Sequence, residues 1–133
     1  MIIPVTAIFA SVLAVLMLFL AYRISMFRLK FKQSLGTTEN PDFQAAVRAH
    51  GNLVEYAPMA LILMAIGEMN GVGALVIYWV GMVFTLGRLL HAWGMVKGQG
   101  GPHRARLFGT LFTWLSMLAM AILVAWNVIQ VNA

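Results

Sequence analysis

The chain has 133 residues, of which 62% are hydrophobic and only 10% are charged. Soluble domains average about 45–50% apolar and about 25% charged residues, so this composition indicates a small integral membrane protein. The sequence contains no cysteine, which excludes a disulfide framework, a cysteine nucleophile and a cysteine-based metal site.

Four apolar stretches follow one another along the chain, at about residues 4–22, 53–69, 74–90 and 107–128. Each approaches the roughly 20 residues that an α-helix needs to cross a bilayer core of about 30 Å. Only helices and closed barrels satisfy backbone hydrogen bonds in lipid, and continuous apolar runs favour helices. We therefore expect a single all-α domain over residues 1–133, folded as an up-and-down bundle of four transmembrane helices.

The basic residues lie in or beside the two connections that follow the first and third spans. The nine are Arg23, Arg28, Lys30, Lys32, Arg48, Arg88, Lys97, Arg104 and Arg106. With four spans, both connections lie on one side of the membrane, which the positive-inside rule assigns to the cytoplasm, leaving both termini in the periplasm. Topology then accounts for most of the net charge of +5, and we expect no nucleic-acid partner.

The second span is preceded by the polar stretch "RAHGNLVEYAP", which covers residues 48–58. Arg48, Asn52 and Glu55 are spaced i, i+4 and i+7, so they share one stripe of a helix, and His50 points to nearly the opposite side. Ionisable groups at membrane depth cost at least about 2.5 kcal/mol each and therefore need a partner other than lipid. Two interpretations remain open: a binding site, or an ion-pair network that fixes helix packing.

The third and fourth spans bring more cations to the same depth. Arg88 and His91 lie one turn apart at the end of the third span, and Arg104 and Arg106 open the fourth. These arginines outnumber the carboxylates near them, which indicates an anionic ligand, because a guanidinium stays charged and matches carboxylates in bidentate fashion.

A competing explanation for the basic residues is attraction to anionic lipid headgroups, worth about 1 kcal/mol per residue near the surface. We assign that role to Lys30 and Lys32, which lie in the connection itself. No metal site is expected, because His91 has no second histidine or cysteine at ligand spacing.

The stretch "RAHGNLVEYAP" resembles the second-helix signature of the MAPEG family, the membrane-associated proteins in eicosanoid and glutathione metabolism. Arg48, His50, Asn52 and Glu55 fall at the family's spacing, and Pro58 follows them. The "GRLLH" end of the third span and the arginine-rich start of the fourth extend the resemblance over nearly the whole chain. The chain is most similar to the small bacterial branch, with its inner-membrane members, and to microsomal glutathione S-transferase.

This resemblance implies a homotrimer in the bacterial inner membrane, with glutathione held between neighbouring subunits near the cytoplasmic side. By the family motif, Arg48 and Asn52 hold carboxylate or backbone groups of glutathione, and Glu55 receives its ammonium group. Arg88 and His91 complete the polar wall.

The first helix contributes one more arginine by the same resemblance. Arg28, in "FRLKF" after the first span, is similar to the family's first-helix arginine, and Arg23 is the alternative.

The resemblance also implies a mechanism. Arg104 matches the fourth-helix arginine that the family places near the sulfur of glutathione, where a cation favours the thiolate, the nucleophilic form. Attack on a hydrophobic electrophile from the bilayer gives transferase activity, and attack on a lipid hydroperoxide gives peroxidase activity.

Three residues depart from the pattern of the catalytic members. Ala105, Phe108 and Met95 stand where hydroxyl-bearing residues occur in several of them. The alternative function is therefore a non-catalytic lipid-binding or scaffold protein of the same fold.

Overall fold

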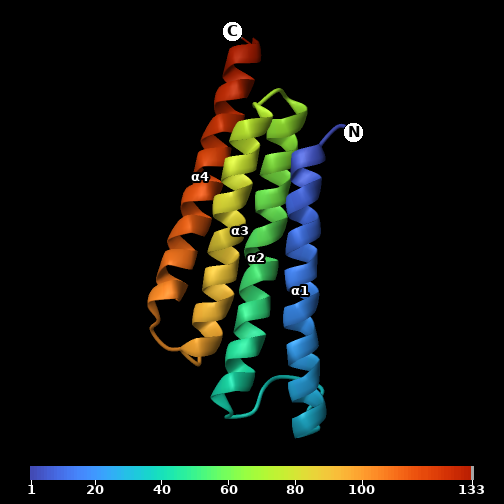
Figure 1. Ribbon diagram of the computed structural model, residues 1–133, viewed down its shortest axis with the longest axis vertical. Coiled ribbons are helices and arrows are strands. Elements are labelled where there is room, and N and C mark those ends of the chain that lie inside the picture. Colours follow the sequence, from blue (N-terminus) through green and yellow to red (C-terminus); the bar gives the residue numbers. More distant parts are fainter. Residues whose placement is uncertain (133) are drawn as a thin grey trace.

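The computed structural model describes residues 1–132, with side chains described up to residue 130. The chain forms four helices in this range: α1 (Pro4–Phe31), α2 (Pro41–Met69), α3 (Ala74–Lys97) and α4 (Arg104–Asn132). They run up and down beside one another, with the N-terminus, the α2–α3 turn and the end of α4 at one end (Figure 1). All four are long and apolar enough to cross a membrane. The predicted fold class, a four-helix transmembrane bundle, is confirmed.

The helices extend beyond the predicted spans at the end that carries the connections 32–40 and 98–103, which we call the basic end. The first helix continues past residue 22 to Phe31, and α2 begins at Pro41, because the amphipathic run from Asp42 extends the second span at its start, as the sequence predicts. Hydropathy reports only the part of a helix that lies in lipid, whereas backbone hydrogen bonding continues into water. Asn40 caps α2 by accepting a hydrogen bond from the backbone N–H of Phe43 at 3.0 Å.

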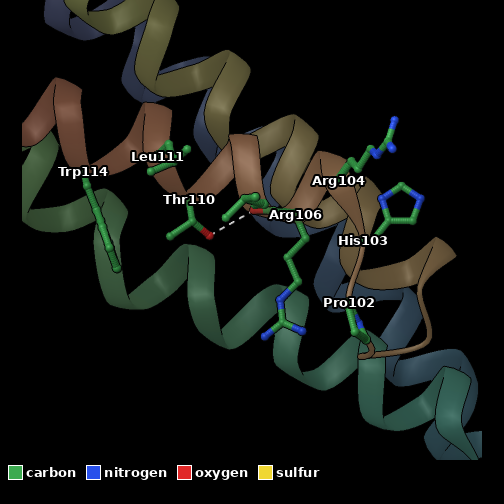
Figure 2. Close-up of a pocket in the computed structure, with 8 residues that line it drawn as sticks. Pro102, His103, Arg104, Arg106, Thr110, Leu111 and Trp114 are labelled. Atoms are coloured by element: carbon green, nitrogen blue, oxygen red, sulfur yellow. Dashed lines mark hydrogen bonds between the residues drawn. The ribbon is translucent and has the colours of Figure 1, made fainter.

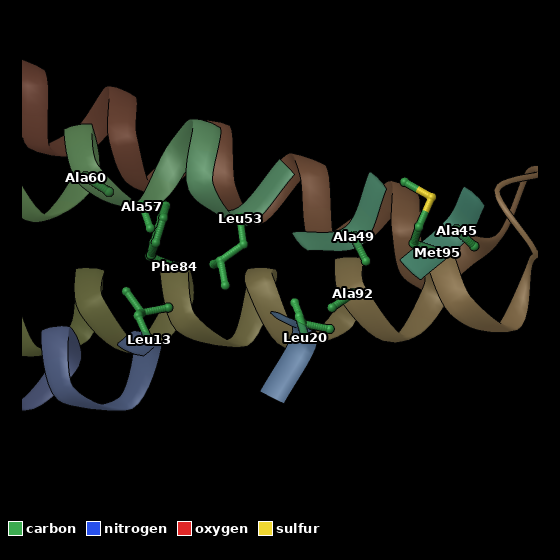
Figure 3. Packing of buried hydrophobic residues seen from close by; sticks show 10 residues of the cluster. All are labelled: Leu13, Leu20, Ala45, Ala49, Leu53, Ala57, Ala60, Phe84, Ala92 and Met95. Carbon is green, nitrogen blue, oxygen red and sulfur yellow. The ribbon is translucent and has the colours of Figure 1, made fainter. Parts of the chain in front are cut away.

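The core at the basic end is built on small residues of α2. Ala45, Ala49, Ala57 and Ala60 are all buried along one side of this helix, with Leu53 among them. Figure 3 shows this side of α2 facing leucines of α1 and larger side chains of α3. Small residues let membrane helices approach closely, and van der Waals packing then stabilises the bundle.

The third and fourth helices pack closely through glycine. A methyl group on Gly109 would lie 2.5 Å from the backbone nitrogen of His91, and one on Gly87 would lie 3.0 Å from the carbonyl oxygen of Gly109. No side chain fits at such separations without displacing a helix. These glycines therefore hold the first turns of α4 against the part of α3 that carries Arg88 and His91.

The opposite end is fixed by Glu68 near the end of α2. Its carboxylate accepts hydrogen bonds from the backbone N–H groups of Val5 and Thr6, at 2.9 and 2.8 Å, and from the Thr6 hydroxyl at 2.7 Å. The first N–H groups of a helix have no partner within the helix, and a carboxylate also complements the positive end of the helix dipole. Glu68 thus caps α1 and lies far from the basic end.

Candidate functional site

Arg48 and Glu55 form an accessible ion pair on α2. The Arg48 Nη1 atom lies 3.4 Å from Glu55 Oε1, and the two side chains are 60% and 54% exposed. This contact places both residues on one stripe of the helix, as their spacing predicts. Exposed ion pairs contribute only about 0–1 kcal/mol, so a ligand can separate them at little cost.

Asn52 turns away from that pair toward α3. Its Oδ1 atom accepts a hydrogen bond from Arg88 Nη1 at 2.7 Å. The guanidinium of Arg88 also donates from Nη2 to the carbonyl of Gly109 at 3.4 Å, so it joins α2, α3 and α4. The predicted stripe therefore divides into an accessible pair and a buried hydrogen bond between helices.

Arg88 is a buried cation without a carboxylate partner among the described residues. It is only 2% exposed, and the one ion pair found in residues 1–130 is Arg48–Glu55. Its guanidinium carbon lies 5.2 Å from the ring centroid of Tyr56 and 5.9 Å from that of Phe84. Its Nε atom is buried and has no hydrogen-bond partner. Aromatic faces and neutral acceptors thus compensate this charge only in part.

His91 lies one turn beyond Arg88 and is 4% exposed. The charges of Arg88, Arg106 and Arg48 act on its imidazole. These three cations come from α3, α4 and α2, so three helices bring positive charge to the region of His91.

The fourth helix borders an open groove of about 520 Å³ at the basic end. Arg104, Arg106, Thr110, Leu111 and Trp114 are among the residues that line it. Figure 2 shows Arg106 and Trp114 extending toward α2, whereas Arg104 extends in a different direction. Arg104, which is exposed, and Arg106, which extends toward α2, therefore lie on two sides of α4.

Arg106 is held by the turn that precedes α4. Its Nη1 atom donates to the carbonyl oxygens of Gly100 and Gly101, at 2.7 and 3.3 Å. These bonds fix the guanidinium between the turn and α2, near the end of the groove. The sequence indicates only that Arg104 and Arg106 open the helix, because their directions depend on how α4 is rotated in the bundle.

Tyr56 is a candidate site residue to which the sequence analysis gives no role. Its hydroxyl accepts a hydrogen bond from Trp114 Nε1 at 3.2 Å, and its ring lies under the Arg88 guanidinium. Because the hydroxyl oxygen accepts from Trp114, its own proton is free to be donated to another acceptor. The available signal is its position directly after Glu55, but a tyrosine near a membrane boundary is usually an interfacial anchor.

A family model for the MAPEG family matches residues 6–126 of this chain. The chain belongs to the MAPEG family. It is 32% identical over 122 residues to the inner membrane protein YecN of Escherichia coli strain K12, which covers 92% of this chain and 91% of that protein. YecN of Escherichia coli O6:H1 strain CFT073 matches with the same identity and coverage. Together with the four apolar helices, these relatives support an integral inner-membrane protein.

In this MAPEG protein, Arg28 lies apart from the Arg48–Arg88 cluster. Its Nη1 atom donates to the carbonyl oxygens of Ser34 and Gln33 in the first connection, and its guanidinium lies 5.8 Å from the Phe43 ring centroid. In the described residues α1 contacts α2 and α3 but not α4. One chain alone therefore does not bring Arg28 to the arginines of α4.

The three residues without hydroxyls occupy different environments in this MAPEG chain. Met95 is 3% exposed and belongs to the hydrophobic core, and Ala105 is 9% exposed at the α3–α4 contact. Phe108 is 51% exposed on the outer side of α4. The Tyr56 hydroxyl of α2 contacts the groove residue Trp114.

Proposed function

We propose that this protein binds glutathione at the basic end and transfers it to a hydrophobic electrophile or uses it to reduce lipid hydroperoxides. The observation that carries this proposal is the accessible Arg48–Glu55 pair beside the buried, carboxylate-free Arg88. The site therefore offers a ligand one accessible cation, Arg48, and one accessible anion, Glu55. The buried charge of Arg88 lies nearby without a carboxylate to balance it.

Glutathione has the charges that this arrangement requires: two carboxylates, one ammonium group and a thiol. Arg48 would bind a carboxylate, and Glu55 would receive the ammonium once the pair opens. Arg88 would supply long-range attraction for the second carboxylate, and Asn52 would orient it. In this proposal His91 lines the glutathione site as a hydrogen-bonding group.

Arginine and tyrosine would then stabilise the thiolate. A cysteine thiol has a pKa near about 8.5, and a nearby cation lowers it by favouring the charged form. Arg104 is the candidate from the family motif; Arg106, which extends toward α2, and the Tyr56 hydroxyl, which contacts the groove residue Trp114, are the further candidates. The thiolate sulfur forms a bond to an electrophilic carbon while the bond from that carbon to its leaving group, or to the ring oxygen of an epoxide, breaks and its electron pair goes to the departing atom. The alkoxide formed from an epoxide then takes a proton from water.

A second copy of the chain would complete the site, which is consistent with the homotrimer that the family implies. Arg104 is exposed, and α1 with Arg28 does not reach α4 in one chain. Glutathione between two subunits would bring the two arginines to one ligand. In this arrangement the basic connections face the cytoplasm, where the tripeptide is supplied.

The hydrophobic substrate would enter from the bilayer. Leu107 and Trp114 on the groove are 58% and 54% exposed, and Leu111 between them is 40% exposed. An apolar wall that opens sideways to lipid admits hydrophobic molecules without passage through water.

Equilibrium dialysis of the purified protein with labelled glutathione tests the binding proposal. Saturable binding that Arg48→Ala weakens at least about tenfold supports it, since each 1.4 kcal/mol corresponds to a factor of ten. Unsaturable uptake that is the same in wild-type and Arg48→Ala protein would contradict it.

The alternative, a non-catalytic lipid-binding or scaffold protein, is favoured by the environment of Ala105 and Met95, neither of which offers a hydroxyl to a thiolate. Conjugation of glutathione to a hydrophobic electrophile separates the two functions. Turnover that Arg104→Ala or Tyr56→Phe lowers rejects the alternative. Binding without turnover, in folded wild-type protein, supports it.

A further inference from the structure

Arg23 lies between two apolar grooves on α1. One groove, of about 300 Å³, runs between α1 and α3, and Arg23 lines it together with apolar side chains of both helices. The second, of about 280 Å³, lies along the last turns of α1 and is also lined by Arg23, with Phe27 and Lys30. The same guanidinium therefore borders both grooves.

The position of Arg23 along α1 corresponds to the edge of the bilayer. The helix begins at Pro4, and about 20 residues cross a bilayer core, so Arg23 reaches the headgroup level. The groove between α1 and α3 extends from Arg23 to Leu16, a rise of about 10 Å at 1.5 Å per residue. Arg23 therefore lies at the headgroup end of this apolar groove, which extends toward the middle of the membrane.

The groove between α1 and α3 opens to lipid. Phe19 of α1 is 57% exposed, and Leu89 and Trp93 of α3 are 45% and 54% exposed. At its floor, Leu20 and Ala92 are buried. This arrangement provides a long apolar wall on each side and a closed base between two helices, which suits one extended hydrocarbon chain.

No carboxylate lines either groove. Among the acidic residues, Glu55 pairs with Arg48, Asp42 accepts a hydrogen bond from Gln99, and Glu68 caps α1. In the described part of the chain, Arg23 and Lys30 make no ion pair. They are spaced i and i+7, so both face the same side of α1. Their charge is complementary to an anion at the membrane surface.

We propose that this face of α1 binds an anionic glycerophospholipid, with its phosphate at Arg23 and Lys30 and one acyl chain in the groove between α1 and α3. Arginine binds phosphate oxygens in bidentate fashion, and lysine adds a point charge. Neither groove includes Arg48, Glu55 or Arg106, so the lipid site is separate from the glutathione site and does not rest on it. Arg23 then serves the lipid and leaves Arg28 as the first-helix residue for glutathione.

Lipid binding is measured by native mass spectrometry of protein incubated with phosphatidylglycerol or phosphatidylcholine of identical acyl chains. Two surface cations predict an about tenfold to thirtyfold preference for phosphatidylglycerol in the wild-type protein. The double variant Arg23→Gln/Lys30→Gln should bind both lipids equally. Lys32→Gln is the control, because it removes one positive charge from an exposed residue outside both grooves, and it should keep the preference; Lys30→Gln, which also removes one charge, should reduce it.

A second variant tests the acyl-chain position. The chain has no cysteine, so Leu89→Cys can be labelled alone with a bulky maleimide that fills the groove. This label should reduce phosphatidylglycerol binding, whereas the same label on Leu75→Cys, an exposed residue near the start of α3, should leave it unchanged.

Three results would overturn the proposal. The first is equal binding of the two lipids by the wild-type protein, and the second is an equal loss of preference in Lys32→Gln and in the double variant. The third is rapid disulfide formation between subunits by Leu89→Cys, which would show that a second copy of the chain covers this groove.

Discussion

Arg88 Nη1 donates to Asn52 Oδ1 at 2.7 Å, which links the middle of the predicted ligand stripe to a buried cation on the next helix. Asn52 therefore stabilises the bundle whether or not glutathione is bound. Removing its side-chain oxygen leaves Arg88 with two long carbonyl contacts, to the backbone of Asn52 at 3.5 Å and of Gly109 at 3.4 Å, and a partnerless Nε atom.

We expect Asn52→Ala to destabilise the protein by about 1–3 kcal/mol in the absence of any ligand, the usual cost of leaving a buried charged donor unpaired. Asn52→Asp keeps an acceptor oxygen and adds an opposite charge, so it should retain most of the stability. Thermal unfolding in detergent measures both. Equal stability of wild-type and Asn52→Ala protein would show that this hydrogen bond has no structural role.

The accessible pair on α2 should behave in the opposite way. Arg48→Ala and Glu55→Ala should each weaken glutathione binding while leaving the unfolding temperature nearly unchanged, because an exposed ion pair contributes only about 0–1 kcal/mol. His50→Ala, on another side of the helix, should mainly affect packing between helices or subunits. A larger loss of glutathione affinity in His50→Ala than in the other two would contradict this division.

Close packing of α3 on α4 gives a third prediction. The added methyl group in Gly109→Ala would lie 2.5 Å from the His91 nitrogen and 2.6 Å from the Gly87 oxygen, so the helices must separate. Overpacking of this kind costs about 1–3 kcal/mol. The control is Gly73→Ala, where no atom lies within 4 Å of the added methyl. Unfolding of both variants at the wild-type temperature would contradict the close packing of α3 on α4 at Gly109.

At the other end of the bundle, Glu68→Gln should loosen the start of α1. An amide cannot accept with both of its terminal atoms, so at least one of the hydrogen bonds from Val5 and Thr6 is lost, at a cost of about 1–3 kcal/mol. Glu39→Gln, in the exposed first connection, should change stability by less than about 0.5 kcal/mol. Hydrogen exchange of the α1 amides measures the effect locally, and unchanged exchange in Glu68→Gln would rule out the cap.

The sequence predicts the architecture well because lipid imposes strong constraints. Hydropathy locates four spans, and the two basic connections lie at one end of the bundle. Helix length is less predictable, because the outer turns of α1 and α2 mix polar and apolar residues and continue until Lys32 adopts a left-handed backbone or Asn40 provides a cap.

The candidate site is predictable only in part. Spacing alone places Arg48 and Glu55 on one stripe, and the structure shows them paired. Spacing does not reveal that Asn52 accepts a hydrogen bond from Arg88, since that bond depends on how closely α2 and α3 approach each other. The rotation of α4 likewise decides that Arg106 and Trp114 face α2, and it allows Trp114 to donate a hydrogen bond to the Tyr56 hydroxyl.

Glutathione binding as the thiolate is the central claim, and a titration followed by ultraviolet thiolate absorbance tests it most directly. Glutathione is added to the purified protein near neutral pH, where a free thiol with a pKa near about 8.5 is mostly protonated. We predict a saturable thiolate signal in the wild-type protein, a smaller signal in Arg104→Ala or Arg106→Ala, and a shift to weaker binding in Arg48→Ala. The absence of any saturable signal from folded wild-type protein would contradict the account.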